Sequence, residues 1–195
     1  MDVVLASGNA GKLREFAQML AGLDLQIRPQ SAFAVPPVAE TGTTFVENAI
    51  IKARHASRHT RLPAIADDSG LMVAALGGAP GVYSARYAGD SASDEDNRRR
   101  LLTVMHALDD SARACRFICV LAFLRSADDP LPLLATGVWE GQLARVPRGG
   151  NGFGYDPLFL VAAHQCTAAE LTGVMKNQLS HRGQALRALR AALAA

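Results

Sequence analysis

The start of the chain has the pattern of a strand, a tight turn and a helix. An apolar run at residues 3–6 leads into the turn sequence Ser-Gly-Asn-Ala-Gly-Lys at residues 7–12. Leu13, Phe16 and Leu20 then recur at helical spacing, which predicts an amphipathic helix after the turn. A helix in this position directs its free N–H groups and the positive end of its dipole toward the turn. The pattern therefore predicts an anion-binding turn with Lys12 as a counter-charge, and a plain strand–helix connection is the alternative.

The turn differs from the two common phosphate-binding motifs. A Walker A loop requires Gly five residues before Gly11 and Ser or Thr after the lysine, where this chain has Ala6 and Leu13. The G-x-G-x-x-G pattern of dinucleotide-binding folds is also absent at this turn. A phosphate site here must therefore belong to another class of protein.

Strand and helix patterns alternate along the rest of the chain. Residues 63–66 and 116–125 have the composition of buried strands, and residues 133–146 are interpreted as a partner of the second strand. Capping signals at Thr44, Ser93 and Ser180 predict further helices. Because no repeat, low-complexity stretch or linker interrupts the pattern, the sequence predicts a single domain over residues 1–195, of the α/β class with a mixed sheet.

Composition narrows the classes of function. Apolar residues make up 49% of the chain and charged residues 19%, which is typical of a folded globular protein. The net charge of +2 gives no reason to expect nucleic acid or a membrane surface as a partner, and the basic run at residues 98–100 is interpreted as a solvated helix face. The sequence begins without a signal-peptide pattern and has no apolar run long enough to span a bilayer, so we expect a cytoplasmic protein.

Two adjacent carboxylates, Asp67 and Asp68, are expected at the end of a short buried strand. Because side chains alternate between the faces of a strand, one carboxylate can face a cleft while the structure holds the other. Glu40 lies in a preceding loop, and a few carboxylate oxygens completed by water are the ligands that Mg²⁺ prefers. The sequence thus predicts that these carboxylates bind Mg²⁺ next to the phosphate-binding turn. The alternative is that the two aspartates only form a turn or cap a helix. Glu47 stands three residues after Thr44 and is assigned to helix capping instead.

Two further segments carry candidate ligand-binding residues. Residues 149–157 combine four glycines with two aromatic residues, and an aromatic ring in such a tight loop can either stack on a flat base or serve packing. Farther along the chain, Lys176 precedes the sequence Ser-His-Arg-Gly at residues 180–183. The helix dipole disfavours a cation at the start of a helix, so Arg182 is expected to have a compensating anion or a hydrogen-bonding ligand, and a merely exposed arginine is the alternative.

Together these motifs resemble one family, the noncanonical purine nucleoside triphosphate pyrophosphatases of the RdgB and inosine triphosphatase group. The resemblance covers nearly the whole chain, and seven motifs in the same order are far more specific than any one of them. The matching segments are S-G-N-A-G-K at 7–12, E-T-G at 40–42, F-V-E-N-A at 45–49, A-D-D-S-G-L at 66–71, G-G-A-P-G-V-Y-S-A-R-Y at 77–87, G-F-G-Y-D-P at 152–157 and S-H-R-G at 180–183.

The resemblance implies both a fold and an activity. The implied fold is inosine triphosphatase-like, an α/β fold with a long mixed sheet, flanking helices and two lobes with an active-site groove between them, usually as a homodimer. The implied activity is hydrolysis of ITP, dITP and XTP to the nucleoside monophosphate and pyrophosphate with Mg²⁺. Such an enzyme keeps deaminated purines out of DNA and RNA.

The resemblance also implies roles for individual residues. Asp68 would be the catalytic carboxylate and a metal ligand, with Glu40 as a second ligand of the metal. The residues that would bind the nucleotide are Ser7, Gly8, Asn9, Ala10, Gly11, Lys12, Ser69, Phe153, Gly154, Tyr155, Asp156, Lys176, His181 and Arg182. Lys52 could also reach phosphate, but a lysine on a helix face is ordinarily solvated, so Lys52 is left out of this site.

Two other functions fit parts of the pattern. A pyrophosphatase of the Maf type would prefer methylated pyrimidine or dTTP-like nucleotides. A non-catalytic nucleotide sensor would bind a nucleotide without releasing pyrophosphate. Paired carboxylates beside a phosphate-binding turn argue against the sensor, and turnover with a panel of nucleotides separates all three functions.

Overall fold

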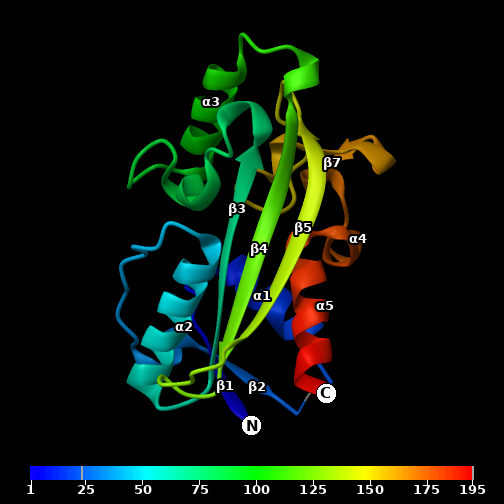
Figure 1. Ribbon diagram of the computed structural model, residues 1–195. Helices are drawn as coiled ribbons and strands as arrows, with labels where there is room; N and C mark the ends of the chain where they lie inside the picture. The colour runs from blue at the N-terminus through cyan, green and yellow to red at the C-terminus, as the bar shows by residue number, and fades with distance from the viewer. Residues whose placement is uncertain (23, 195) are drawn as a thin grey trace. The chain divides into compact units, whose positions relative to one another are not determined.

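The chain forms two compact units in a computed structural model that describes residues 1–22 and 24–194 (Figure 1). Unit 1 comprises residues 1–68, 119–137 and 182–195, and unit 2 comprises residues 69–118 and 138–181. Three long strands contribute residues to both units: β3 (Ala64–Val73), β4 (Ala114–Leu124) and β5 (Leu133–Leu143). The sequence predicts a single domain over residues 1–195, and the division into two compact units does not test that prediction.

The strands of the described residues form a seven-stranded sheet in the order β2-β1-β3-β4-β5-β6-β7. Strand β1 (Asp2–Leu5) runs parallel to β2 (Gln26–Pro29) and to β3. Strand β6 (Phe159–Val161) pairs antiparallel with β5 and with β7 (Cys166–Thr167). The combination of parallel and antiparallel pairs confirms the predicted α/β class with a mixed sheet.

Unit 1 contains the helices α1 (Ala10–Met19) and α2 (Phe45–Thr60), together with α5 (His181–Ala194) from Arg182 onward. Phe16 of α1 and Leu186 of α5 are buried in one apolar cluster with residues of β1, β3 and β4. The apolar positions predicted for the first helix are therefore the ones that pack. This packing fixes the start of α1, and with it the turn at residues 7–12.

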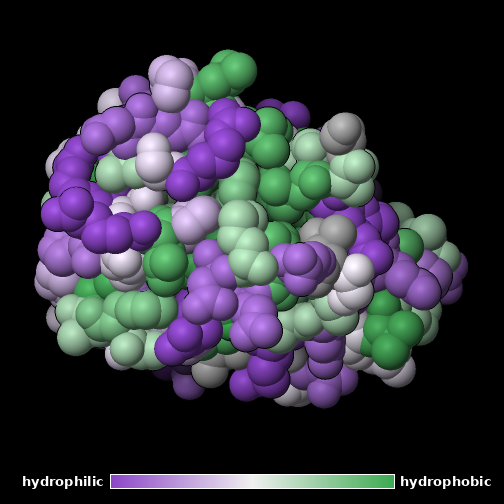
Figure 2. All heavy atoms as spheres, turned by 90° about the horizontal axis from the view of Figure 1, so that it is seen from below, coloured by the Kyte–Doolittle hydropathy of each residue, from purple (hydrophilic) through white to green (hydrophobic). Residues whose placement is uncertain are grey.

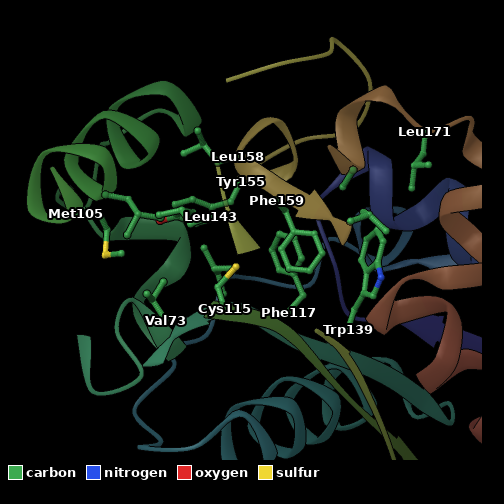
Figure 3. Packing of buried hydrophobic residues seen from close by; sticks show 14 residues of the cluster. Val73, Met105, Cys115, Phe117, Trp139, Leu143, Tyr155, Leu158, Phe159 and Leu171 are labelled. Carbon is green, nitrogen blue, oxygen red and sulfur yellow. The ribbon is translucent and has the colours of Figure 1, made fainter. Parts of the chain in front are cut away.

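Unit 2 contains the helices α3 (Asp94–Met105) and α4 (Gly173–Leu179) and a second apolar cluster. Figure 3 shows Phe117, Trp139 and Phe159 side by side in this cluster. The ring centroids of Phe117 and Phe159 lie 4.6 Å apart, and those of Trp139 and Phe159 lie 4.8 Å apart. Tyr155 belongs to the same cluster, so the core of unit 2 anchors the glycine-rich segment that precedes β6.

The strand that carries Asp67 and Asp68 is longer than the sequence predicts. The sequence predicts a short strand with these residues at its end, but β3 continues to Val73. Leu71 and Val73 are fully buried in the apolar cluster of unit 2, and this burial continues the strand through Gly70. The expected position at a strand end is therefore wrong, and the two aspartates lie in the middle of β3.

Polar and apolar side chains are intermingled on the face that Figure 2 shows. Some large apolar side chains are exposed, among them Leu131 and Val174. Exposed apolar residues of this kind are ordinary on a protein surface. Within residues 1–22 and 24–194, no helix has the length and apolar character needed to cross a membrane.

Candidate active site

The turn at residues 7–12 is built by hydrogen bonds from its own polar side chains. The Asn9 side chain caps α1 by accepting the Lys12 N–H at 3.0 Å, and the Ser7 hydroxyl accepts the Asn9 N–H at 3.2 Å. A Cβ atom placed on Gly8 would meet no other described atom within 4 Å, so the backbone there is open to an approaching group. The predicted helix is present, but it begins at Ala10, within the segment predicted as the turn, and its N-terminus adjoins this open backbone.

Asp67 is a buried carboxylate held by two cations. Its Oδ2 atom lies 2.8 Å from Lys12 Nζ and 3.3 Å from a guanidinium nitrogen of Arg182, and its side chain is only 1% exposed. Burial alone would raise the pKa of Asp67, but the charges of Lys12 and Arg182 outweigh it and hold that pKa well below its usual range. Asp67 is therefore the aspartate of the pair that the structure holds.

Arg182 has the compensating anions that its place at a helix start predicts. Its guanidinium lies 2.7 Å from the Glu15 carboxylate as well as 3.3 Å from Asp67. Burial lowers the pKa of Arg182, but the two carboxylates outweigh burial and raise it, so the side chain remains cationic. Lys12, Asp67, Arg182 and Glu15 thus form a continuous chain of ion pairs in unit 1.

Asp68 has a different environment, although it is the next residue. Its Oδ1 atom accepts a hydrogen bond from Lys52 Nζ at 2.7 Å. Its Oδ2 atom is buried and has no hydrogen-bond partner among residues 1–22 and 24–194. Burial raises the pKa of Asp68 to about 6, against the opposing charge of Lys52. A carboxylate with this pKa can accept a proton near neutral pH, as a general base must.

Lys52 belongs to this site, although the sequence interpretation sets it aside. The side chain is 14% exposed, and Nζ lies 3.3 Å from Glu40 Oε1 in addition to its bond to Asp68. Burial lowers the pKa of Lys52, but Asp68, Asp67 and Glu40 outweigh burial and raise it. The expectation of a solvated lysine is therefore wrong. Its position three residues after Ala49, on the buried face of α2, is the sequence signal that could have identified it.

The loop that carries Glu40 is fastened to the start of α2. Thr44 and Glu47 form the predicted capping box, and the Glu47 carboxylate also accepts the Thr43 N–H at 2.8 Å. Asn48, which the sequence interpretation did not single out, accepts the Gly42 N–H at 2.8 Å. A Cβ atom on Gly42 would come within 2.5 Å of the Glu47 side chain, so the close approach of this loop requires glycine.

The donor set around Asp68 fits a hard divalent cation. Glu40 and Asp68 supply carboxylate oxygens, the ligand type that Mg²⁺ prefers, and the unpartnered Oδ2 of Asp68 is a ready acceptor. In the described part of the chain, no group of three or more His, Cys, Asp and Glu side chains is arranged to hold a metal ion. Water and substrate oxygens would therefore have to complete the coordination, as is usual for Mg²⁺.

A second cluster of predicted site residues lies in unit 2. Asp156 Oδ2 accepts hydrogen bonds from the Phe153 N–H at 2.9 Å and from Lys176 Nζ at 2.7 Å. Lys176 Nζ also lies 5.0 Å from the centre of the Phe153 ring, at cation–π distance. A Cβ atom on Gly152 would collide with the Asp156 carboxylate. The predicted tight loop is thus organised around Asp156.

Tyr155 and His181 are held by the core of unit 2. The Tyr155 hydroxyl donates to the Ser84 carbonyl oxygen at 2.9 Å, and burial raises the pKa of this phenol. Because the Tyr155 side chain lies in the apolar cluster, only its backbone remains for the predicted substrate contact. The His181 imidazole stacks on Phe117 at 4.7 Å between centroids, with 15° between the planes. The imidazole plane is therefore fixed by an aromatic stack.

The predicted site residues divide between the two units. Unit 1 holds the turn at residues 7–12, Glu40, Asp68 and Arg182. The predicted site residues in unit 2 are Ser69, Phe153, Gly154, Tyr155, Asp156, Lys176 and His181. The consecutive pairs Asp68–Ser69 and His181–Arg182 connect one unit to the other along the chain.

Comparisons with known proteins match the chain over nearly its whole length. A family model described as the Ham1 family matches residues 3–192. Two curated proteins named dITP/XTP pyrophosphatase are similar to the chain. The protein of Coxiella burnetii is 56% identical over 189 residues, covering 97% of this chain and 94% of that protein. The protein of Vibrio cholerae is 57% identical over 187 residues, covering 96% and 94%.

Solved structures agree with these matches. A structure described as a HAM1 protein from Coxiella burnetii has a TM-score of 0.94 at 55% identity, covering 100% of this chain and 98% of the other. A structure of the Staphylococcus aureus Ham1 protein has a TM-score of 0.88 at 40% identity, covering 99% and 98%. The fold, including the seven-stranded mixed sheet, is therefore shared over the whole chain.

Proposed function

This chain belongs to the Ham1 family, and from that premise we propose that it hydrolyses dITP, ITP and XTP to the nucleoside monophosphate and pyrophosphate. The similarity to proteins named dITP/XTP pyrophosphatase supports the substrate class. The observation that carries the chemistry is the buried Oδ2 of Asp68, which has no hydrogen-bond partner in the described part of the chain and lies beside Lys52 and Glu40.

The triphosphate is assigned to the turn of unit 1. The N–H groups at the start of α1 are suited to bind phosphate oxygens, and Lys12 adds a positive charge that is already held in place by Asp67. The open backbone at Gly8 lets phosphate approach this N-terminus closely. Positioning and charge neutralisation of this kind supply most of the catalysis in phosphoryl chemistry.

Asp68 and Glu40 would hold Mg²⁺ in this proposal. When bound, the ion neutralises charge on the phosphate oxygens and lowers the pKa of coordinated water. Asp68 accepts a proton from the attacking water, whose oxygen forms a bond to the α-phosphorus. The bond from that phosphorus to the bridging oxygen breaks, and pyrophosphate leaves with the electron pair. Lys52 keeps Asp68 oriented through its 2.7 Å hydrogen bond.

The purine base is assigned to the cluster of unit 2 that contains Phe153, Asp156 and Lys176. Hypoxanthine and xanthine carry a 6-keto acceptor, whereas adenine carries a 6-amino donor. A site that presents N–H donors to this position, from the loop around Phe153 or from Arg182, accepts the keto group and mispairs with the amino group. Leaving buried donors unpaired in this way discriminates strongly between otherwise similar substrates.

Replacing Phe153 with Ala is expected to weaken nucleotide binding. Stacking of a base on an aromatic side chain contributes about 1–3 kcal/mol, so KM for dITP should rise by about 5- to 150-fold. Steady-state kinetics with dITP measures the effect, and Phe153→Tyr, which keeps a ring, is the matched control. An unchanged KM in Phe153→Ala would rule out stacking on this residue.

A product assay over a panel of nucleotides tests the proposed function. ITP, XTP, GTP, ATP and dTTP are each incubated with the protein, with Mg²⁺ or with EDTA, and pyrophosphate and orthophosphate are quantified. We expect equimolar monophosphate and pyrophosphate from ITP and XTP, at least about a hundredfold less from ATP, and none in EDTA. Preference for dTTP would favour the Maf-type function, and binding without products would favour a nucleotide sensor.

We propose that the enzyme acts as a homodimer in the cytoplasm, where the nucleotide pool lies. Sedimentation equilibrium of the purified protein gives the oligomeric state directly, and a mass equal to that of one chain at micromolar concentration would contradict the dimer.

A further inference from the structure

Helix α3 holds both polar groups of Gly154. The Gly154 N–H donates to Asp94 Oδ2 at 2.7 Å, and the Gly154 carbonyl oxygen accepts from Arg98 Nη1 at 2.7 Å. Asp94 and Arg98 are four residues apart, so they lie one above the other on the same face of the helix. The interpretation of residues 98–100 as a solvated face is thus wrong for Arg98, while Arg99 is exposed and pairs with Glu95.

These contacts determine the backbone on both sides of Phe153. The N–H of Phe153 is held by Asp156 at 2.9 Å, and the next peptide group is held by Asp94 through the Gly154 N–H. Gly154 itself has a φ of +61°, in the left-handed region that glycine adopts without strain. With both neighbouring peptide groups fixed, the direction in which the Phe153 side chain leaves the backbone is fixed as well.

Helix α3 is a rigid support for this purpose. Its start is closed by a capping box between Ser93 and Asp96, and Leu101 and Met105 are fully buried in the core of unit 2. Asn97, which lies between Asp94 and Arg98 in the sequence, is buried, and its side chain accepts the Ala88 N–H at 2.8 Å. The two side chains that reach Gly154 therefore project from a helix that cannot shift independently of the core.

We propose that Asp94 and Arg98 are positioning residues that hold Phe153 ready to stack on the purine base. The inference rests on the proposed function, because it assigns Phe153 to the base. A ring fixed before the substrate arrives does not have to be ordered on binding. Asp94 and Arg98 therefore increase affinity without taking part in bond breaking. Its loss should therefore affect KM rather than kcat.

Steady-state kinetics with dITP on single variants tests the inference. Asp94→Ala and Arg98→Met are expected to raise KM by about tenfold and to leave kcat within about twofold. Asp94→Asn, which keeps a carbonyl acceptor for the Gly154 N–H, should restore most of the affinity. Arg99→Met removes a neighbouring exposed arginine of the same helix and should leave KM unchanged.

A double-mutant cycle separates positioning from general stability. In a Phe153→Ala background the ring is absent, so adding Arg98→Met should raise KM no further. An equal rise in both backgrounds, or an unchanged KM in correctly folded Asp94→Ala and Arg98→Met, would overturn the inference while the wild-type activity stands. Absence of pyrophosphate release by the wild-type protein would overturn the proposed function, and the inference would fall with it.

Discussion

Asp68→Asn is expected to lower kcat for dITP by about a thousandfold or more while the protein stays folded. The substitution keeps the size of the side chain but removes the group that accepts the proton from water, and general-base catalysis alone contributes about 10²–10⁴-fold. It also removes one of the two carboxylates assigned to Mg²⁺. Pyrophosphate release measures the effect, and wild-type activity in this variant would remove Asp68 from the mechanism.

The same variant should gain stability rather than lose it. The pKa of Asp68 is raised in the folded protein, so folding disfavours the ionised carboxylate, and Asn mimics the protonated form. The penalty in the wild-type protein develops as pH rises through the ordinary aspartate pKa to about 6, and it is constant above that. In EDTA, the melting temperature of Asp68→Asn should match the wild-type value near pH 4 and exceed it at pH 7.5. A lower melting temperature at pH 7.5 would show that Asp68 is structural.

Asp67→Asn is expected to have the opposite effect and to destabilise the protein by about 3 kcal/mol at neutral pH. Removing one partner of a buried ion pair leaves an uncompensated charge, and here both Lys12 and Arg182 lose their shared carboxylate. For a chain of this size the loss corresponds to a melting temperature lower by about 6–12 °C. Thermal unfolding at pH 7.5 in EDTA measures it.

The sign of the pH dependence follows from the direction of the pKa shift. The pKa of Asp67 is lowered on folding, so its contribution to stability is fully present above the pKa of an unfolded aspartate and is lost as pH falls through the folded value. The loss of stability in Asp67→Asn, relative to the wild-type protein, should therefore be largest at pH 7.5 and become smaller in strong acid. Asp68→Asn is the matched control at the neighbouring position, and equal stability changes in the two variants would contradict the division of roles.

Several parts of this site could be predicted because they depend on local sequence. The N-terminal turn follows from an apolar run, glycines and a helical stripe, and the capping box of α2 follows from Thr44 and Glu47. The division between Asp67 and Asp68 follows from the alternation of side chains along a strand. Each of these inferences uses residues within a few positions of one another, where geometry is set by the backbone.

Other parts depend on contacts between residues far apart in the sequence. Lys52 looked like a surface residue because Glu40 and Asp68 lie in other elements. Arg98 looked like part of a basic run because its partner, Gly154, lies 56 positions away. The full extent of β3 does not follow from the short apolar run at residues 63–66, because the burial of Leu71 and Val73 in unit 2 continues the strand. Tertiary packing determines the environment of such residues, and the periodicity of the sequence does not reveal tertiary packing.

Selectivity for deaminated purine nucleotides is measured by the ratio of kcat/KM for dITP to that for dATP, from pyrophosphate release by the same preparation with Mg²⁺. Asp68→Asn serves as the blank for contaminating activities. We expect a ratio of at least about a hundred for the wild-type protein and no release above background for Asp68→Asn. A ratio near one, or release of orthophosphate in place of pyrophosphate, would contradict this expectation.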